Sequence, residues 1–204
     1  LPLNGLLVKL ATLSVPDGKQ EEKPVLLDER LLATPAVAIQ RSQDIAARMA
    51  EDSAQAMRLA MGLIQKFDRK SLDRVLELEN NTDRYEDALG TYLVQLSSRS
   101  LSVADSRILN TLLYTISDVE RIADHAVNVG KAALEMEEKK IVFSQQAQGE
   151  LEVLERAISD ILGRTVEAYR SFDRELARKV EPQEQVVDAL VRDCLLYTSD
   201  AADE

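Results

Sequence analysis

The apolar residues of this chain recur every three or four positions along most of its length, which is the spacing of one face of an α-helix. The first such stretch covers residues 35–67. Thr34 followed by Pro35 is a typical helix start, because the hydroxyl can cap the helix and proline fits its first position. A second stretch covers residues 72–96 and is interrupted at 97–102. The pattern therefore predicts two long helices in the first half of the chain.

Three further helical segments are predicted after this interruption. Ser102 with Asp105 three residues later resembles a capping box, and the apolar positions that follow predict a third helix to about residue 138. Residues 139–143 connect it to a fourth helix. The apolar residues of that helix follow an unbroken heptad repeat, which suits a helix packed lengthwise in a bundle: Ala147, Leu151, Leu154, Ile158, Ile161, Thr165, Ala168 and Phe172. With a fifth segment over 173–193, the sequence predicts an all-α protein.

Part of the chain is repeated. Residues 67–83 (FDRKSLDRVLELENNTD) recur as residues 172–188 (FDRELARKVEPQEQVVD), with six identities and no gap, so we infer a tandem repeat of about a hundred residues. The first repeat, over 34–138, has three predicted helices, whereas the second, over 139–193, has two. Apolar surface on the fourth and fifth helices is therefore expected to stay uncovered. Pro182 is expected to kink the fifth helix, since proline removes a hydrogen bond inside a helix.

The two ends of the chain differ from this repeat. Residues 1–13 are apolar but shorter than the roughly 20 residues of a membrane-spanning helix, and charge and proline follow, so we expect residues 1–33 to be the end of a membrane segment and a linker. An apolar terminus that docks on the core is the alternative. Residues 194–204 (CLLYTSDAADE) break the helical pattern and resemble the translation of a sequencing-library adapter. The native chain is thus expected to end near residue 193.

Composition narrows the classes of function. With 25 Lys and Arg against 36 Asp and Glu, the net charge is -11, which argues against nucleic acids and anionic membrane surfaces as partners. The 45% content of apolar residues excludes disorder over the whole chain. The one cysteine, Cys194, excludes an intramolecular disulfide and is typical of a reducing compartment, but it lies in the suspected adapter-derived tail. Cations are therefore the more natural ligands.

Acidic residues stand in pairs four positions apart. Such pairs share a helix face, where two like charges cost about 0.2–0.5 kcal/mol unless a cation intervenes. Carboxylates from adjacent helices suit hard cations such as Mg, Mn or Fe. The candidate metal ligands are the members of the three pairs: Glu79, Asp83, Glu120, Asp124, Glu184 and Asp188. The alternative is that these acids only form solvated helix faces.

The sequence predicts no enzyme. A di-iron oxidase would need a glutamate three residues before a histidine, but Ile122 stands three residues before His125, the only histidine. A phosphate-binding glycine loop, a zinc-ligand cluster and a Ser/His/Asp set are all missing from the sequence. His125 is expected at the surface or the edge of the core, with a hydrogen bond to Arg121 or Asp118.

Two segments show a resemblance to a known family. Residues 75–83 (VLELENNTD) and 118–128 (DVERIADHAVN) resemble the PhoU family, helical proteins of two three-helix repeats whose acidic motifs bind metal clusters. The resemblance implies a PhoU-like three-helix bundle followed by the first two helices of a second repeat. It also implies that the acids at 79, 83, 120 and 124 hold divalent or ferric ions between the second and third helices.

A third segment resembles part of a larger protein. Residues 27–40 (LDERLLATPAVAIQ) look like the junction in bacterial sodium-dependent phosphate cotransporters that carry a cytosolic PhoU-like domain after their membrane part. This resemblance implies a regulatory domain on the cytoplasmic side of the cell inner membrane, whose partner is its own transmembrane transport domain. A second copy of the chain and phosphate-signalling proteins are candidate further partners. The alternatives are a free-standing PhoU-type regulator of phosphate import and a helical scaffold or adaptor that binds no metal.

Overall fold

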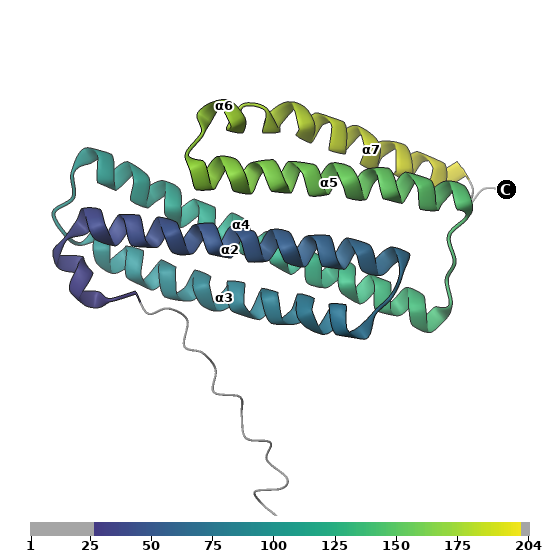
Figure 1. Ribbon diagram of the computed structural model, residues 1–204, viewed down its shortest axis with the longest axis horizontal. Coiled ribbons are helices and arrows are strands. Elements are labelled where there is room, and N and C mark those ends of the chain that lie inside the picture. The colour runs from purple at the N-terminus through teal and green to yellow at the C-terminus, as the bar shows by residue number, and fades with distance from the viewer. Residues whose placement is uncertain (1–26, 201–204) are drawn as a thin grey trace, which may run out of the picture.

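The computed structural model describes residues 27–200, with the side chains of residues 27–192. A short 3-10 helix leads into three long helices that run side by side as an antiparallel bundle, and two further helices joined by a short one lie along this bundle (Figure 1). The elements are η1 (Glu29–Ala33), α2 (Pro35–Gln65), α3 (Arg69–Ser97), α4 (Val103–Lys139), α5 (Gln145–Ser171), α6 (Arg174–Ala177) and α7 (Val180–Asp200). The described residues contain no strand, which confirms the prediction of an all-α fold.

Local sequence explains where most of the helices begin. Ser102 caps α4 by accepting a hydrogen bond from the Asp105 N–H at 3.1 Å, and Asp68 caps α3 by accepting from Ser71 N–H at 2.9 Å. Thr34 does not cap α2 with its side chain, contrary to the sequence-based expectation. Residue 34 already ends η1, since its own N–H donates to the carbonyl of Leu31, so η1 and Pro35 start α2 instead.

Two apolar cores hold the three-helix bundle together. The first core lies at the end where η1 docks, and its fully buried members include Met49 of α2 and Leu89, Leu93 and Leu96 of α3. The second core lies at the other end and is built around Leu63, Leu72, Val75, Leu78 and Ala126. Because both cores draw on α2, α3 and α4, burial of this surface is what fixes the alignment of α3 with α4.

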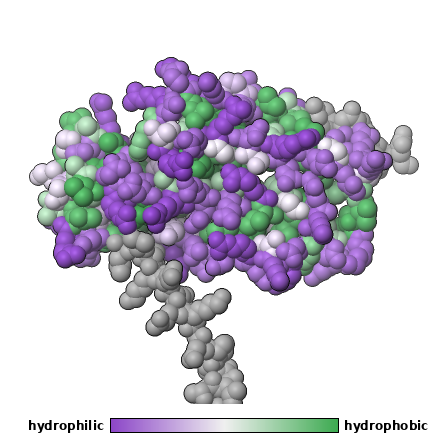
Figure 2. Space-filling model, in the orientation of Figure 1, coloured by the Kyte–Doolittle hydropathy of each residue, from purple (hydrophilic) through white to green (hydrophobic). Residues whose placement is uncertain are grey.

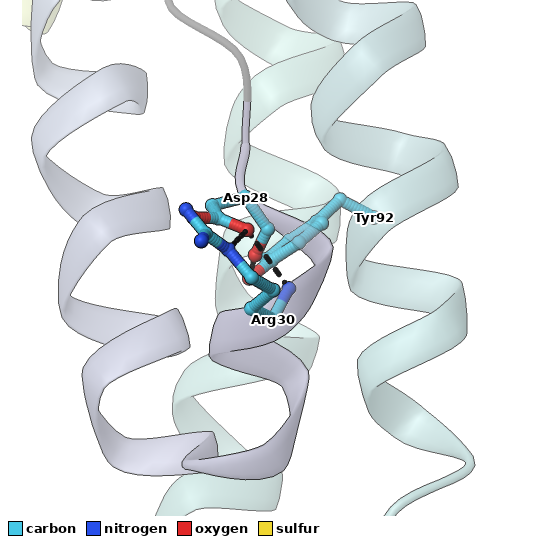
Figure 3. A network of polar contacts seen from close by, with 3 residues as sticks. All are labelled: Asp28, Arg30 and Tyr92. Carbon is cyan, nitrogen blue, oxygen red and sulfur yellow. Dashed lines mark hydrogen bonds and ion pairs between the residues drawn. The ribbon is translucent and has the colours of Figure 1, made fainter.

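A small polar network fastens η1 to the bundle (Figure 3). The Tyr92 hydroxyl of α3 donates a hydrogen bond to the Asp28 backbone carbonyl at 3.2 Å. The Asp28 carboxylate caps η1 by accepting from the Arg30 N–H, and it also pairs with the Arg30 guanidinium at 2.6 Å. These contacts place the start of the described chain against α3.

Loss of the Tyr92 hydroxyl should have a modest effect on stability. Replacing Tyr92 by phenylalanine keeps the ring in the first core and removes the bond to Asp28, so we expect a loss of about 0.5–1.5 kcal/mol in the free energy of unfolding. Urea denaturation followed by circular dichroism measures it. Tyr114 of α4 is 77% exposed, and replacement there by phenylalanine is the matched control, expected to change stability by less than about 0.5 kcal/mol. Equal effects of the two substitutions would contradict the role given to the hydroxyl.

The second helical pair is poorly covered. Of the described side chains from residue 145 onward, only Ala168 is buried. Residues of the α5 heptad such as Leu151 and Ile158 are only half-buried, and hydrophobic residues break through the polar surface along the α5–α7 pair (Figure 2). The expectation of uncovered apolar surface on these two helices is confirmed for the described side chains.

The fifth segment differs from its prediction in two ways. The chain breaks between α6 and α7, at residues 178–179, so Pro182 is the third residue of α7 and kinks no helix. A proline in a first helical turn removes no intrahelical hydrogen bond, because the N–H groups there have no partner in the helix. The backbone also stays helical to residue 200, past the expected break at 193, and residues 194–200 contain neither proline nor glycine.

No helix among residues 27–200 combines the length and the apolar character that crossing a bilayer requires. The predicted end of a membrane segment, residues 1–13, lies outside the described residues.

Candidate functional site

The α3–α4 interface places four of the six candidate ligands near one another. Glu79 and Asp83 lie on α3 beside the buried positions Leu78 and Thr82, and the Thr82 hydroxyl donates to the Leu78 carbonyl at 2.9 Å. On α4, Glu120 and Asp124 follow the buried residues Val119 and Ala123 in the same way. Each acid therefore stands next in sequence to a residue that packs inward, at the border between core and solvent.

The two glutamates interact with acids of the facing helix. Partial burial raises the pKa of Glu79, and the nearby carboxylates of Asp124 and Asp83 raise it further, while Lys131 acts in the opposite direction. Burial likewise raises the pKa of Glu120, and the negative charges of neighbouring acids raise it further. Carboxylates from α3 and α4 thus form one group whose negative charges repel one another.

One acidic residue of this group was not among the sequence-based candidates. Glu86 of α3 raises the pKa of Glu120, after Asp124 and ahead of Asp83 and Glu79. Its position seven residues after Glu79 puts it on the same face of α3, two turns further along. The spacing could have identified it, but only the position of α4 shows which acid it meets. We call Glu79, Asp83, Glu86, Glu120 and Asp124 the acidic face.

The third acidic pair lies elsewhere. Glu184 and Asp188 are exposed on α7, which packs against α5 and α6 and against neither α3 nor α4. The structure therefore brings four of the six predicted ligands onto one face and separates the other two. Within the described range, no three acidic, histidine or cysteine side chains are placed closely enough to hold a metal ion.

The neighbouring polar residues of α4 lie at the surface. His125 is exposed, and Arg121 pairs with Asp118 at 4.0 Å between Nη1 and Oδ1. The site is thus a row of carboxylates whose charges repel one another, and such a row attracts cations.

The repulsion predicts a pH dependence. A carboxyl group with a raised pKa in the folded state binds its proton more tightly than in the unfolded chain, so it destabilises the fold above that pKa and ceases to do so below its unfolded value. In a metal-free buffer, replacing Glu79 and Glu120 by glutamine should raise Tm at pH 7 by roughly 1–3 °C and should have almost no effect near pH 4.

Glu135 of α4 is the matched control for this prediction. The hydrogen bond from Lys139 lowers its pKa and the charge of Lys139 lowers it further, so Glu135→Gln should lower Tm at pH 7 rather than raise it. Thermal unfolding followed by circular dichroism at both pH values decides between these outcomes. A lower Tm at pH 7 for the Glu79/Glu120 variant would show that the acidic face does not repel itself.

Comparison with known protein families shows a match that includes the acidic face. Residues 46–133 match the family model described as "PhoU domain". The match begins in α2, includes all of α3 and ends in α4, so it contains the whole acidic face and leaves out Glu184 and Asp188. The match supports a PhoU-family protein.

Curated relatives agree with the family match. The chain is similar to the phosphate-specific transport system accessory protein PhoU homolog of Xylella fastidiosa (strain 9a5c), 25% identical over 154 residues, which are 74% of this chain and 64% of the relative. It is also similar to the phosphate-specific transport system accessory protein PhoU of Escherichia coli (strain K12), 29% identical over 132 residues, which are 61% of this chain and 52% of the relative. The chain thus spans less than two thirds of either protein. No solved structure gives a significant match.

Proposed function

We propose that this chain is a PhoU-type regulatory domain that adjusts phosphate transport. The observation that supports this most strongly is the match of residues 46–133 to the PhoU domain, because the match includes the parts of α3 and α4 that carry the acidic face. The relatives are named accessory proteins of phosphate-specific transport systems, a description that fits a regulator better than an enzyme. In this proposal the chain catalyses no reaction and acts by binding.

A free-standing accessory regulator fits the comparisons better than a transporter domain. Both relatives described above are accessory proteins, whereas the cotransporter context rests on the resemblance of residues 27–40 to a junction sequence. The sodium-dependent cotransporter, its transmembrane partner domain and its place at the inner membrane stay predictions. The nucleotide sequence upstream of the codon for Leu1 tests them directly.

We further propose that the acidic face binds a hard cation such as Mg, Mn or Fe. Its donors are all carboxylates, which these ions prefer, and a bound cation would relieve the repulsion that raises the pKa values of Glu79 and Glu120. Because no three donors converge among the described side chains, binding requires the carboxylates to turn toward the ion. Glu79, Asp83, Glu120 and Asp124 would hold it, and its chemical contribution would be charge neutralisation.

Metal titration tests the acidic face. We expect Mg, Mn or Fe to raise the Tm of the wild-type chain, because an ion that binds only the folded state stabilises it by mass action. A variant with Glu79→Gln, Asp83→Asn, Glu120→Gln and Asp124→Asn should lose this response and should melt slightly higher without metal. The matched control, Glu184→Gln with Asp188→Asn, removes the pair on α7 and should respond like the wild type.

The outcomes of this titration separate the hypotheses. No metal response in the wild type would leave the acids as solvated surface, as in the scaffold interpretation. A response lost in the α7 variant instead would place the ion at Glu184 and Asp188.

The regulatory role has its own test. In a bacterial strain that lacks its phosphate-specific transport accessory protein, expression of this chain should shift phosphate uptake toward that of the parent strain. Uptake of radiolabelled phosphate measures the effect. A folded chain that leaves uptake unchanged would contradict the proposal, whether or not the metal titration succeeds.

A further inference from the structure

An uncovered valley runs between α4 and α5. Helix α2 packs against both of them, yet no Cα atom of α4 lies within 8 Å of one of α5. Apolar side chains of α4 and α5 line it, among them Ile108, Leu112, Leu162, Val166 and Ala168, together with residues of α2. Tyr169 belongs to both of its hollows, one of about 780 Å³ and one of about 70 Å³. We call this surface the α4–α5 valley.

The valley is long enough to bind a helix of about four turns. On α4 its lining extends from Arg107 to Ile122, and at 1.5 Å per residue this length is about 22 Å, or four turns of helix. Figure 1 shows that the α5–α7 pair lies along the bundle without covering the first turns of α4. A groove of this length between two helices suits an elongated partner better than a compact ligand.

Two aromatic side chains of the valley lack the packing or the hydrogen bond that such side chains usually have. Phe172, at the end of α5, is 57% exposed, although phenylalanine is usually a buried residue. The Tyr169 hydroxyl is buried without a hydrogen-bond partner, and burial raises the pKa of Tyr169 to about 12. An uncovered apolar surface with an unsatisfied buried hydroxyl is typical of a binding site from which the partner is missing.

One end of the valley is positively charged. Arg107 of α4 and Arg174 of α6 both line the larger hollow, and neither forms an ion pair with another residue of the described part. The one acid in that lining, Asp173, accepts hydrogen bonds from the N–H groups of Glu175 and Leu176 as the cap of α6 and keeps its charge, so the three charged side chains together carry one net positive charge. In a chain of net charge -11, a net positive charge beside an apolar surface favours an acidic partner.

We propose that the α4–α5 valley binds an amphipathic helix of another protein, one with an apolar face and acidic residues at the end that meets Arg107 and Arg174. Apolar side chains of that helix at positions i, i+3, i+4 and i+7 enter the two hollows, as in other helix-in-groove complexes. Its carboxylates pair with the two guanidinium groups. The valley lies on a different side of α4 from Glu120 and Asp124, so this site does not depend on cation binding at the acidic face.

Binding of two labelled synthetic helices to the full chain tests this inference. Both peptides have 16 residues and the same leucine face; one carries glutamates at one end, and the other carries lysines at the same positions. Fluorescence anisotropy should show at least roughly tenfold tighter binding of the glutamate peptide. Arg107→Glu with Arg174→Glu should reverse this preference, and Thr165→Trp, which fills the larger hollow from an exposed position, should weaken both peptides.

The control variant is Arg156→Glu with Arg164→Glu, which makes the same charge change at two exposed arginines of α5 that line neither hollow. It should keep the preference for the glutamate peptide. Equal affinity for the two peptides, or a preference that survives Arg107→Glu with Arg174→Glu, would overturn the proposal. A dimer in sedimentation equilibrium that Thr165→Trp dissociates would also overturn it, because a second copy of the chain would then fill the valley.

Discussion

Replacing Leu93 by alanine is expected to lower the free energy of unfolding by about 2–5 kcal/mol. Leu93 is fully buried in the first core, where α3 packs against α2 and α4, so truncation removes apolar contacts and leaves a cavity that helices on both sides would have to fill. Urea denaturation followed by circular dichroism measures the change.

The next residue of α3 provides the control. Val94 is 61% exposed, and Val94→Ala should change stability by less than about 0.5 kcal/mol. A Leu93→Ala variant within about 1 kcal/mol of the wild type would mean that the first core is not the main source of stability of the bundle.

Replacing Gly130 by valine should have the second largest effect. A Cβ atom at Gly130 of α4 would lie 2.8 Å from Leu72 Cδ1 of α3, and side chains of Leu63 of α2 and Val75 of α3 lie close by, so the space beside Gly130 is already filled. Valine adds two more carbons there and should cost about 1–3 kcal/mol, since the second core has no room for them. Alanine should cost less, because Leu72 can turn its terminal methyl away and alanine favours the helix by about 1 kcal/mol over glycine.

Gly90 of α3 is the matched control for this substitution. A Cβ atom at Gly90 would meet only open space within 4 Å, so Gly90→Val should leave stability unchanged or raise it slightly through helix propensity. The same denaturation experiment compares the two valine variants. Similar stabilities would show that the packing of Leu72 against Gly130 is not a constraint.

Gly130→Val also connects packing with the candidate site. Gly130 lies six residues after Asp124 on α4, and its contact residue Leu72 lies seven residues before Glu79 on α3. The valine side chain should push the two helices apart and weaken the interaction between Glu79 and Asp124. We therefore expect any metal-induced rise in Tm to be smaller in this variant than in Gly90→Val.

The sequence by itself determined the number of long helices and most of their limits. The predicted first helix, 35–67, ends two residues later than α2, and the predicted third helix, to residue 138, ends one residue before α4. Apolar periodicity and capping residues act within one or two turns, so they can be recognised without the fold. The cap at Thr34 was predicted wrongly because η1, a local element without apolar periodicity, already occupied that position.

Only the tertiary structure decided which acids meet. Glu79, Glu120 and Glu184 each have an aspartate four residues later, yet α3 and α4 pack together while α7 lies against α5 and α6. The choice depends on which apolar faces bury one another, a property of whole helices rather than of a motif. For the same reason the heptad of α5 predicted a packed helix, but the valley beside it, with Arg107 from one helix and Arg174 from another, exists only once the helices are placed.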